Sequence, residues 1–255
     1  MLQLSENRTI LRDLGLALIV SVAVAGIPVA AWAAKVEIGT AKSIVKTVRA
    51  KLDADDRKLK PNDPVFGDET ISTTRNSASQ LRFIDETTLT VGPNSQVVLD
   101  KFVFDPNTGK QEVAINASVG VFRFVTGKLK KKAYRIKTPT ATIGIRGTIF
   151  TMIVDQSGAT DIIVEDGVVQ VSNPTAQVTE QVTVTPGLAT NTAPGQEPTP
   201  PEPPKVETQA KVAIMDATVA IQGGPQATSS PAQQTRLLEV RDEAQELRES
   251  HKCGC

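Results

Sequence analysis

Histidine, cysteine and aromatic side chains are scarce in this chain of 255 residues, and their scarcity limits the chemistry that the chain can carry. It has one histidine, His251, two cysteines, one Trp and one Tyr. Because Cys253 and Cys255 both lie at the extreme C-terminus, no disulfide can join distant parts of a folded core. A charge of one sign is also lacking, since 28 Lys and Arg residues balance 28 Asp and Glu residues. The balance gives no overall attraction to nucleic acid or to a membrane surface.

The N-terminus has the composition of an export signal. Arg8 and Arg12 precede an apolar run over residues 14–34, which ends in Ala31-Trp32-Ala33. This A-x-A pattern is typical of a cleavage site. We therefore predict a signal peptide over residues 1–33, cut after Ala33, and a periplasmic or secreted protein of a Gram-negative bacterium. An apolar run of about 20 residues can also span a bilayer, so an uncleaved helix that tethers the protein is the alternative.

Residues 35–191 have the alternation and the turn residues of an all-β domain. Residues 97–104 and 111–117 flank Asp105-Pro106-Asn107-Thr108-Gly109, which predicts a hairpin. Asp166-Gly167 predicts another tight turn before residues 168–171. About ten short strands without a convincing helix favour a barrel, a sandwich or a solenoid, and periodicity alone does not distinguish the three.

The composition changes again at residue 192. Residues 192–205 are rich in Pro, Thr and Glu, which predicts an extended linker. A helix is predicted over residues 206–222, because apolar residues recur there at helical spacing: Val206, Ala210, Ala213, Ile214, Ala217 and Ile221. Gly223-Gly224-Pro225 ends it.

A second linker over residues 223–232 precedes an amphipathic helix predicted over residues 233–250. Its apolar positions follow at 3-4-3 spacing and are Leu237, Val240, Ala244 and Leu247. This stripe is too short to establish a coiled coil, and a solvated helix is the alternative. Residues 251–255 form a tail that contains the cysteines.

The most informative motifs lie in residues 138–150 and 160–171. The first segment reads Thr-Pro-Thr-Ala-Thr-Ile-Gly-Ile-Arg-Gly-Thr-Ile-Phe, and the second contains Val164-Glu165-Asp166-Gly167-Val168-Val169. The patterns T-P-x-A, R-G-T-x-F and V-x-x-G-x-V resemble the core motif of the FecR family of periplasmic domains, over residues 36–190. The matching residues are Thr138, Pro139, Ala141, Arg146, Gly147, Thr148, Phe150 and Gly167.

The resemblance implies a β-solenoid-like or β-roll domain outside the inner membrane. In the best-known members, that domain receives a signal from an outer-membrane transporter and passes it inward to a sigma factor. Those regulators carry a cytoplasmic helical domain before their membrane segment, whereas about 13 residues precede the apolar run here. Direct anti-sigma activity is therefore not expected of this chain.

The motif residues themselves indicate a structural role. Pro139 has no amide proton and fixes φ, which places it at a strand start or an edge. Gly144 and Gly147 permit positive φ or a close backbone approach. None of the motif residues requires a catalytic role.

One dense basic cluster follows residue 125, and we interpret it as a binding surface for an anion or an acidic partner. It consists of Lys128, Lys130, Lys131, Lys132, Arg135 and Lys137, with Arg123 and Arg146 nearby in sequence. The partner would be a protein or polymer of the cell envelope, and the compartment disfavours nucleic acid. The alternative is a solvated hairpin tip that keeps a sheet edge from aggregating.

The C-terminal tail offers two further hypotheses. His251, Cys253 and Cys255 could bind a soft metal, although no fourth ligand lies close in sequence. An intermolecular disulfide through Cys253 or Cys255 fits an oxidising periplasm better. It would join a homodimer that pairs through the last helix, and an unstructured tail is the remaining alternative.

No catalytic set stands out, so we predict a non-enzymatic protein without a cofactor or a resident metal. No G-x-S-x-G motif occurs, and the lone histidine lies outside the β domain. The sequence therefore predicts an exported binding or interaction module, involved in sensing envelope signals. A membrane-tethered sensor and a structural envelope component are the alternatives.

Overall fold

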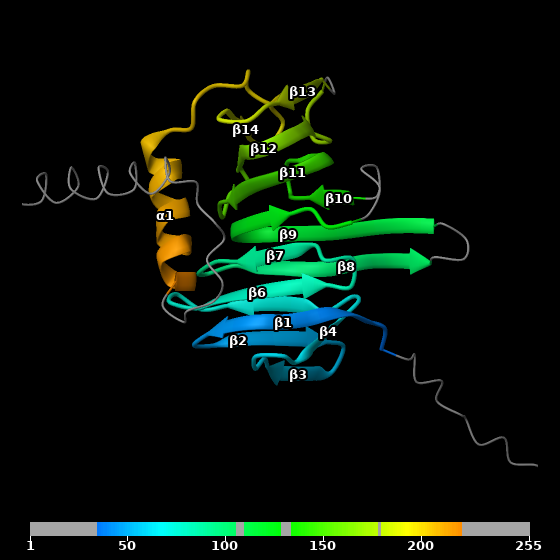
Figure 1. Ribbon diagram of the computed structural model, residues 1–255. Coiled ribbons are helices and arrows are strands. Elements are labelled where there is room, and N and C mark those ends of the chain that lie inside the picture. Colours follow the sequence, from blue (N-terminus) through cyan, green and yellow to red (C-terminus); the bar gives the residue numbers. More distant parts are fainter. Residues whose placement is uncertain (1–34, 106–109, 129–133, 178–179, 221–255) are drawn as a thin grey trace, which may run out of the picture. The chain divides into compact units, whose positions relative to one another are not determined.

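The computed structural model describes residues 35–105, 110–128, 134–177 and 180–220 (Figure 1). In this part of the chain, fourteen strands pair into one continuous sheet, and one helix follows them. The strands are β1 (Glu37–Val45), β2 (Val48–Leu52), β3 (Asp55–Lys58), β4 (Pro64–Phe66), β5 (Thr70–Thr73), β6 (Ala78–Phe83), β7 (Thr88–Val91), β8 (Gln96–Asp105), β9 (Lys110–Val125), β10 (Tyr134–Lys137), β11 (Thr142–Val154), β12 (Thr160–Ser172), β13 (Gln181–Val184) and β14 (Ala189–Thr192), and the helix is α1 (Val206–Ala220). The fold is mostly β, as predicted.

The sheet folds over on itself into two layers, because three long strands pass from one layer into the other. The first half of β9 pairs with β8 and β10, whereas its second half pairs with β7 and β11. β11 and β12 divide in the same way. The first layer contains β4, β1, β6, β7, the second halves of β9 and β11, the first half of β12, and β14. The second layer contains β3, β2, β5, β8, β10, the other halves of the long strands, and β13.

Glycine marks the bend in each of these three strands. Gly120, Gly147 and Gly167 have φ values of 120°, 63° and 78°, which side chains with a Cβ rarely tolerate. The ladder between β11 and β12 also shifts register after Arg146, as a bulge does. The tight turn predicted at Asp166-Gly167 is therefore wrong, because both residues lie inside β12 at its bend.

Apolar side chains fill the space between the two layers. Phe122, Phe124 and Phe150 are fully buried. The ring centroid of Phe124 lies 5.7 Å from those of both Tyr134 and Phe150. Because Tyr134 belongs to the second layer and Phe124 to the first, this contact joins the layers. Burial of each such side chain contributes about 1.5–3 kcal/mol to folding.

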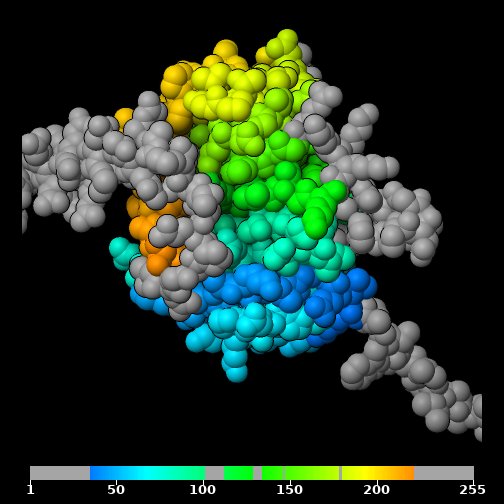
Figure 2. Space-filling view, viewed as in Figure 1, coloured from blue at the N-terminus to red at the C-terminus, as the bar shows by residue number. Residues whose placement is uncertain are grey.

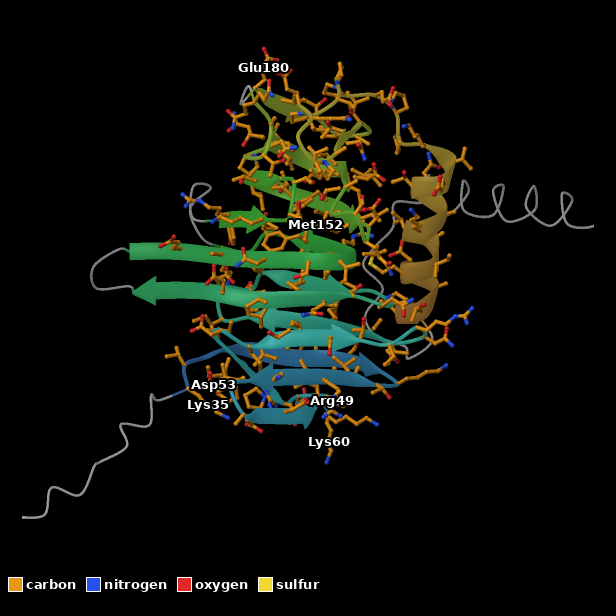
Figure 3. The ribbon with its side chains drawn as sticks, turned by 180° about the vertical axis from the view of Figure 1, so that it is seen from behind. Lys35, Arg49, Asp53, Lys60, Met152 and Glu180 are labelled. Carbon is orange, nitrogen blue, oxygen red and sulfur yellow. The ribbon has the colours of Figure 1, made fainter. Side chains whose placement is uncertain are left out.

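The strands lie side by side from β2 and β3 at one end of the domain to β13 at the other (Figures 1 and 3). Figure 3 places Arg49 and Lys60 at the end of the stack formed by β2 and β3, and Glu180 at the opposite end beside β13. Every strand pair in the described residues is antiparallel except β9–β10. Stacked coils of a solenoid pair in parallel, so the expected solenoid or roll is not confirmed.

The proline-rich segment expected to be a linker lies against the edge of β14. Ala189 and Glu202 exchange backbone hydrogen bonds, with N···O distances of 2.7 and 3.0 Å, and the amide of Thr199 donates to the carbonyl of Asn191. Proline lacks an amide proton, and the non-proline residues of this segment supply the donors. The segment therefore covers a sheet edge and leads directly into α1.

Helix α1 packs against β6, β9 and β11. Met215 is fully buried and lies against the β7–β8 turn, where a Cβ on Gly92 would come within 2.9 Å of its Cγ. The hydroxyl of Thr208 donates to the carboxylate of Asp161 at the start of β12 (3.3 Å). None of the helical segments in the described part has the length and apolar character of a bilayer span. The predicted signal peptide and the cysteine tail lie outside the described residues.

Candidate functional site

The predicted basic cluster lies where β9 leads into β10. Arg135 and Lys137 are exposed on β10, and they alternate with the buried Tyr134 and Ile136. Because successive side chains of a strand point to opposite faces, both cations point outward from the second layer. Lys128 begins the connection, whereas Lys130, Lys131 and Lys132 lie outside the described residues. The connection is not a hairpin, because β9 and β10 are parallel and a hairpin joins antiparallel strands. That the cluster is only a solvated segment stays the alternative.

A buried aspartate in the β6–β7 turn holds both ends of this connection. The amide of Lys128 donates to the carbonyl oxygen of Asp85 (2.8 Å). At the other end, the hydroxyl of Tyr134 donates to Asp85 Oδ2 (2.6 Å). Thr87 also donates to the same carboxylate, through its amide (3.0 Å) and its hydroxyl (2.5 Å). Asp85 is only 4% exposed, so the basic segment starts and ends on a fixed frame.

The cations of the cluster differ in how far their charge is neutralised. Lys128 Nζ lies 2.5 Å from Glu86 Oε1, and this hydrogen bond, with the positive charge, lowers the pKa of the Glu86 carboxyl. Within the described residues, neither Arg135 nor Lys137 forms an ion pair. Their neighbours across the ladders are uncharged and include Ala114, Asn116 and Gly144. The outer face of the second layer therefore presents two cations without an ion pair among the described residues, and the nearest carboxylate across the ladders is that of Asp100, which accepts a hydrogen bond from Asn116 (2.9 Å) beside Lys137.

The nearby Arg123 does not join this surface. Its guanidinium forms an ion pair with Glu165 and lies 3.7 Å from Asp216 on α1, and its side chain is 13% exposed. Burial raises the pKa of Asp216, Arg123 opposes that rise, and Glu165 adds to it. Arg123 therefore helps to fix α1 on the first layer. The side chain of Arg146 lies outside the described part of the structure.

The Thr-Pro-x-Ala residues of the family motif build a buried hydroxyl network. Thr138 Oγ1 accepts the amide of Ala141 (2.9 Å) and lies 2.8 Å from Thr160 Oγ1. Thr140 Oγ1 donates to the carbonyl of Gly158 (2.7 Å) and lies 2.9 Å from the hydroxyl of Thr192. The network joins the β10–β11 turn, the β11–β12 turn and the end of β14. Pro139 lies in the same turn, beside Gly158.

The other motif residues form the bend of β11 and β12. A Cβ on Gly167 would lie 1.8 Å from the carbonyl oxygen of Gly147. Thr148 is 2% exposed, its amide donates to Thr126 Oγ1 (3.0 Å), and Phe150 enters the core between the layers. The motif residues that the structure describes therefore all contribute to the frame.

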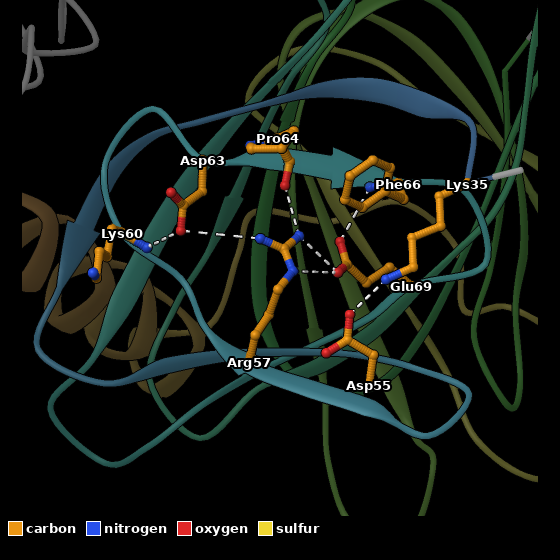
Figure 4. A network of polar contacts seen from close by, with 8 residues as sticks. All are labelled: Lys35, Asp55, Arg57, Lys60, Asp63, Pro64, Phe66 and Glu69. Carbon is orange, nitrogen blue, oxygen red and sulfur yellow. Dashed lines mark hydrogen bonds and ion pairs between the residues drawn. The ribbon is translucent and has the colours of Figure 1, made fainter.

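A second polar network, which the sequence did not reveal, closes the core beside β3 and β4 (Figure 4). Arg57 donates to Glu69 Oε1 from Nε (3.2 Å) and Nη2 (2.8 Å), and to the carbonyl of Pro64 (2.6 Å). Its guanidinium lies 5.3 Å from the centroid of the Phe66 ring. Glu69 is 1% exposed, and its second oxygen accepts the Phe66 amide (3.1 Å). Arg57 and Glu69 lie twelve residues apart without a recognisable motif, so only the folded chain brings them together.

The carboxylate of Asp155 has a structural role. Asp155 accepts hydrogen bonds from Ser157 and Ala159 in the β11–β12 turn, and those from Ser157 lower the pKa of its carboxyl. Among the described residues, no group of three or more His, Cys, Asp or Glu side chains could hold a metal ion. His251, Cys253 and Cys255 lie outside the described residues.

Comparisons with known proteins agree with the motif. Residues 69–170 match the model of the family described as FecR protein. Two crystal structures of a "putative anti-sigma factor" from Parabacteroides distasonis ATCC 8503 are similar at 15% identity and a TM-score of 0.41, over 56% of this chain and 63% or 62% of theirs. This chain thus spans less than two thirds of their length. A search of curated protein sequences finds no match.

Proposed function

We propose that this chain, which carries a FecR domain over residues 69–170, is a non-enzymatic sensing module that is exported and binds an acidic partner of the cell envelope. The surface that would carry the binding is the outer face of the second layer around β10. The observation that supports it is the pair Arg135 and Lys137, both exposed and free of ion pairs within the described residues. Lys130, Lys131 and Lys132 extend the positive charge along the sequence, whereas Lys128 is paired with Glu86.

The rigid strand that carries Arg135 and Lys137 favours binding over simple solvation. A cation on a flexible loop loses conformational freedom when it binds, whereas a cation on a strand has already lost most of it. Arg135 and Lys137 alternate with two side chains that are almost fully buried, and Tyr134 is held by Asp85. The alternative, a charged segment whose only role is to prevent aggregation, does not require the cations to be held in place.

The test is binding to an anionic probe by charge-removing variants. Vesicles of phosphatidylglycerol in phosphatidylcholine and an immobilised polyglutamate peptide distinguish a lipid from an acidic protein as the partner. Each Lys or Arg near an anionic surface contributes about 1 kcal/mol, so the double variant Arg135→Gln/Lys137→Gln should bind about 30-fold more weakly to the preferred probe. The affinity should also fall as salt is added.

A matched control lies on the same layer. Lys51 and Lys58 are exposed on β2 and β3, so Lys51→Gln/Lys58→Gln removes the same charge far from β10. Equal losses in the two double variants would show that only net charge matters. No loss in the Arg135 and Lys137 variant, with either probe, would refute the proposed binding face.

Export is tested by the intact mass of the protein recovered from the envelope fraction. A mass that lacks residues 1–33 supports a cleaved signal peptide and a free module. A full-length mass supports the membrane-tethered sensor instead.

A further inference from the structure

A groove of about 280 Å³ lies on the outer face of the first layer, over β1, β6 and the turn that follows β6. Its lining includes Glu37, Thr40, Lys42, Arg82, Ile84 and Glu86. Figure 2 shows the blue atoms of the N-terminal strands, to which β1 belongs, at the surface of the molecule. None of the lining residues belongs to α1 or to β10, so the groove is separate from the helix contact and from the basic surface.

Two β-bulges shape β1 at this groove. The register of β1 shifts between Glu37 and Gly39 against β4, and between Ala41 and Ser43 against β6. A bulge bends its strand and changes the direction of side chains. A Cβ on Gly39 would lie 2.5 Å from a carbonyl oxygen of β6, so glycine permits the close approach of the two strands. Lys42 is the extra residue of the second bulge, and its exposed side chain lines the groove.

The charged groups are separated along the groove. Lys42 lies five residues after Glu37 on the same strand, so their Cα atoms stand up to about 16 Å apart. Arg82 pairs with Thr40, which lies between them. Neither Lys42 nor Glu37 forms an ion pair with another of the described residues. The groove therefore offers an unpaired carboxylate at one end and an unpaired ammonium at the other.

The turn after β6 adds an apolar side chain near the Glu37 end. The amide of Ile84 donates to a carbonyl of β1 (3.0 Å), which holds the turn beside the start of that strand. The side chain of Ile84 is 53% exposed. Glu86 stands in the same turn, where it is paired with Lys128 and lies 3.8 Å from Arg82. Because the charge of Glu86 is already matched, Glu37 is the carboxylate that a ligand would meet.

The separation of the charges limits the class of ligand. An extended peptide spans about 3.3 Å per residue, so the terminal ammonium and carboxylate of a tripeptide stand about 10 Å apart. The side chains of Glu37 and Lys42 extend toward the ligand and cover the remaining distance. A uniformly acidic polymer would be repelled at Glu37, and a single zwitterionic lipid headgroup is too short to reach both charges.

We propose that this groove binds a short zwitterionic peptide in an extended conformation. The amino terminus of the peptide lies at Glu37, its carboxylate lies at Lys42, and an apolar side chain packs on Ile84. The site does not include Arg135 or Lys137, and it takes a ligand of different charge from the acidic partner proposed for the face around β10.

An NMR titration of the full chain with the tripeptide Ala-Leu-Ala tests the site, followed at the amides of Thr40 and Ile84. Amidation of the peptide carboxylate and Lys42→Gln should each weaken binding about fivefold, which is the effect of one exposed charge pair. Combined, they should weaken it no further, because both changes remove the same pair. Acetylation of the peptide amino terminus and Glu37→Gln should behave in the same way at the other end.

Two control variants carry charge changes elsewhere. Lys51→Gln on β2 and Arg135→Gln/Lys137→Gln on β10 should bind the tripeptide as the unmodified chain does, so a failure of the basic face leaves this site intact. The absence of a saturable shift at Thr40 and Ile84 would overturn the site. If amidation adds to Lys42→Gln but not to Glu37→Gln, the assigned direction of the peptide is reversed. Binding of phosphatidylethanolamine vesicles at these amides, without competition from the tripeptide, would assign the groove to a lipid.

Discussion

Replacing Tyr134 by Phe tests whether Asp85 holds the basic connection in place. The substitution removes only the hydroxyl, which donates to Asp85 Oδ2 at 2.6 Å and lies 3.1 Å from Thr87 Oγ1. The ring keeps its contact with Phe124, 5.7 Å away between centroids. No cavity is created, so the measured change reports on the hydrogen bonds.

The expected loss is about 1.5–3 kcal/mol of unfolding free energy, because a hydrogen bond to a charged acceptor contributes that much. Urea denaturation should show a lower midpoint with an unchanged m-value, since the surface exposed on unfolding stays the same. Hydrogen exchange at the amide of Lys128, which donates to the carbonyl of Asp85, should become faster in the variant.

Thr148→Val is the matched control. The hydroxyl of Thr148 is buried and has no hydrogen-bond partner among the described residues, so an isosteric apolar side chain should be neutral or stabilising. If Tyr134→Phe lowers the unfolding free energy no more than Thr148→Val does, the hydrogen bond between Tyr134 and Asp85 does not hold this connection in place.

Three further predictions follow from the glycine bend, the Arg57 network and the helix contact. Gly187→Ala should cost about 1–2 kcal/mol of unfolding free energy, measured by urea denaturation, because Gly187 has positive φ. Gly167→Ala should cost at least twice as much, because Gly167 also has positive φ and a Cβ there would clash with Gly147. Glu69→Ala should cost about 2–3 kcal/mol, less than for a fully buried pair, because the Arg57 side chain is 25% exposed; the thermal midpoint checks it, and no change would contradict a role in closing the core. The pKa of Asp216 is raised above 3.8 in the folded state, so protonation of Asp216 stabilises the docking of α1. This stabilisation is complete below pH 3.8, and it is lost as the pH rises through the raised pKa. Asp216→Asn should abolish this pH dependence in hydrogen exchange of α1, and an unaltered pH profile would assign it to another group.

The sequence predicted most strands, because their alternation and their turn residues are local signals. Residues 97–104 and 111–117, which were predicted to flank a hairpin, lie in the antiparallel strands β8 and β9. Asp166-Gly167 looked like a hairpin turn, since the same dipeptide provides positive φ in a turn and in a bend. Only the partner strand distinguishes the two, and β11 bends beside it at Gly147.

The arrangement in space depends on contacts that lie far apart in the sequence. The parallel pairing of β9 with β10, the pairing of Glu202 with Ala189, and the network of Arg57 and Glu69 have no local signature. The apolar period of α1 predicted the helix correctly in type but gave no information on which face meets the domain, since Met215 and Thr208 make that contact. The basic residues were visible from the sequence, whereas the buried hydrogen bond between Tyr134 and Asp85 was not.

Site-specific photocrosslinking in intact cells tests the central claim most directly. A photoreactive side chain at position 144 would stand beside Arg135 on the outer face of the second layer, where a Cβ meets nothing closer than 3.8 Å. The account predicts an adduct with an acidic envelope component at position 144, none at Lys51, and its loss in the Arg135→Gln/Lys137→Gln background. An adduct that forms equally at both positions, or survives removal of the two charges, would contradict it.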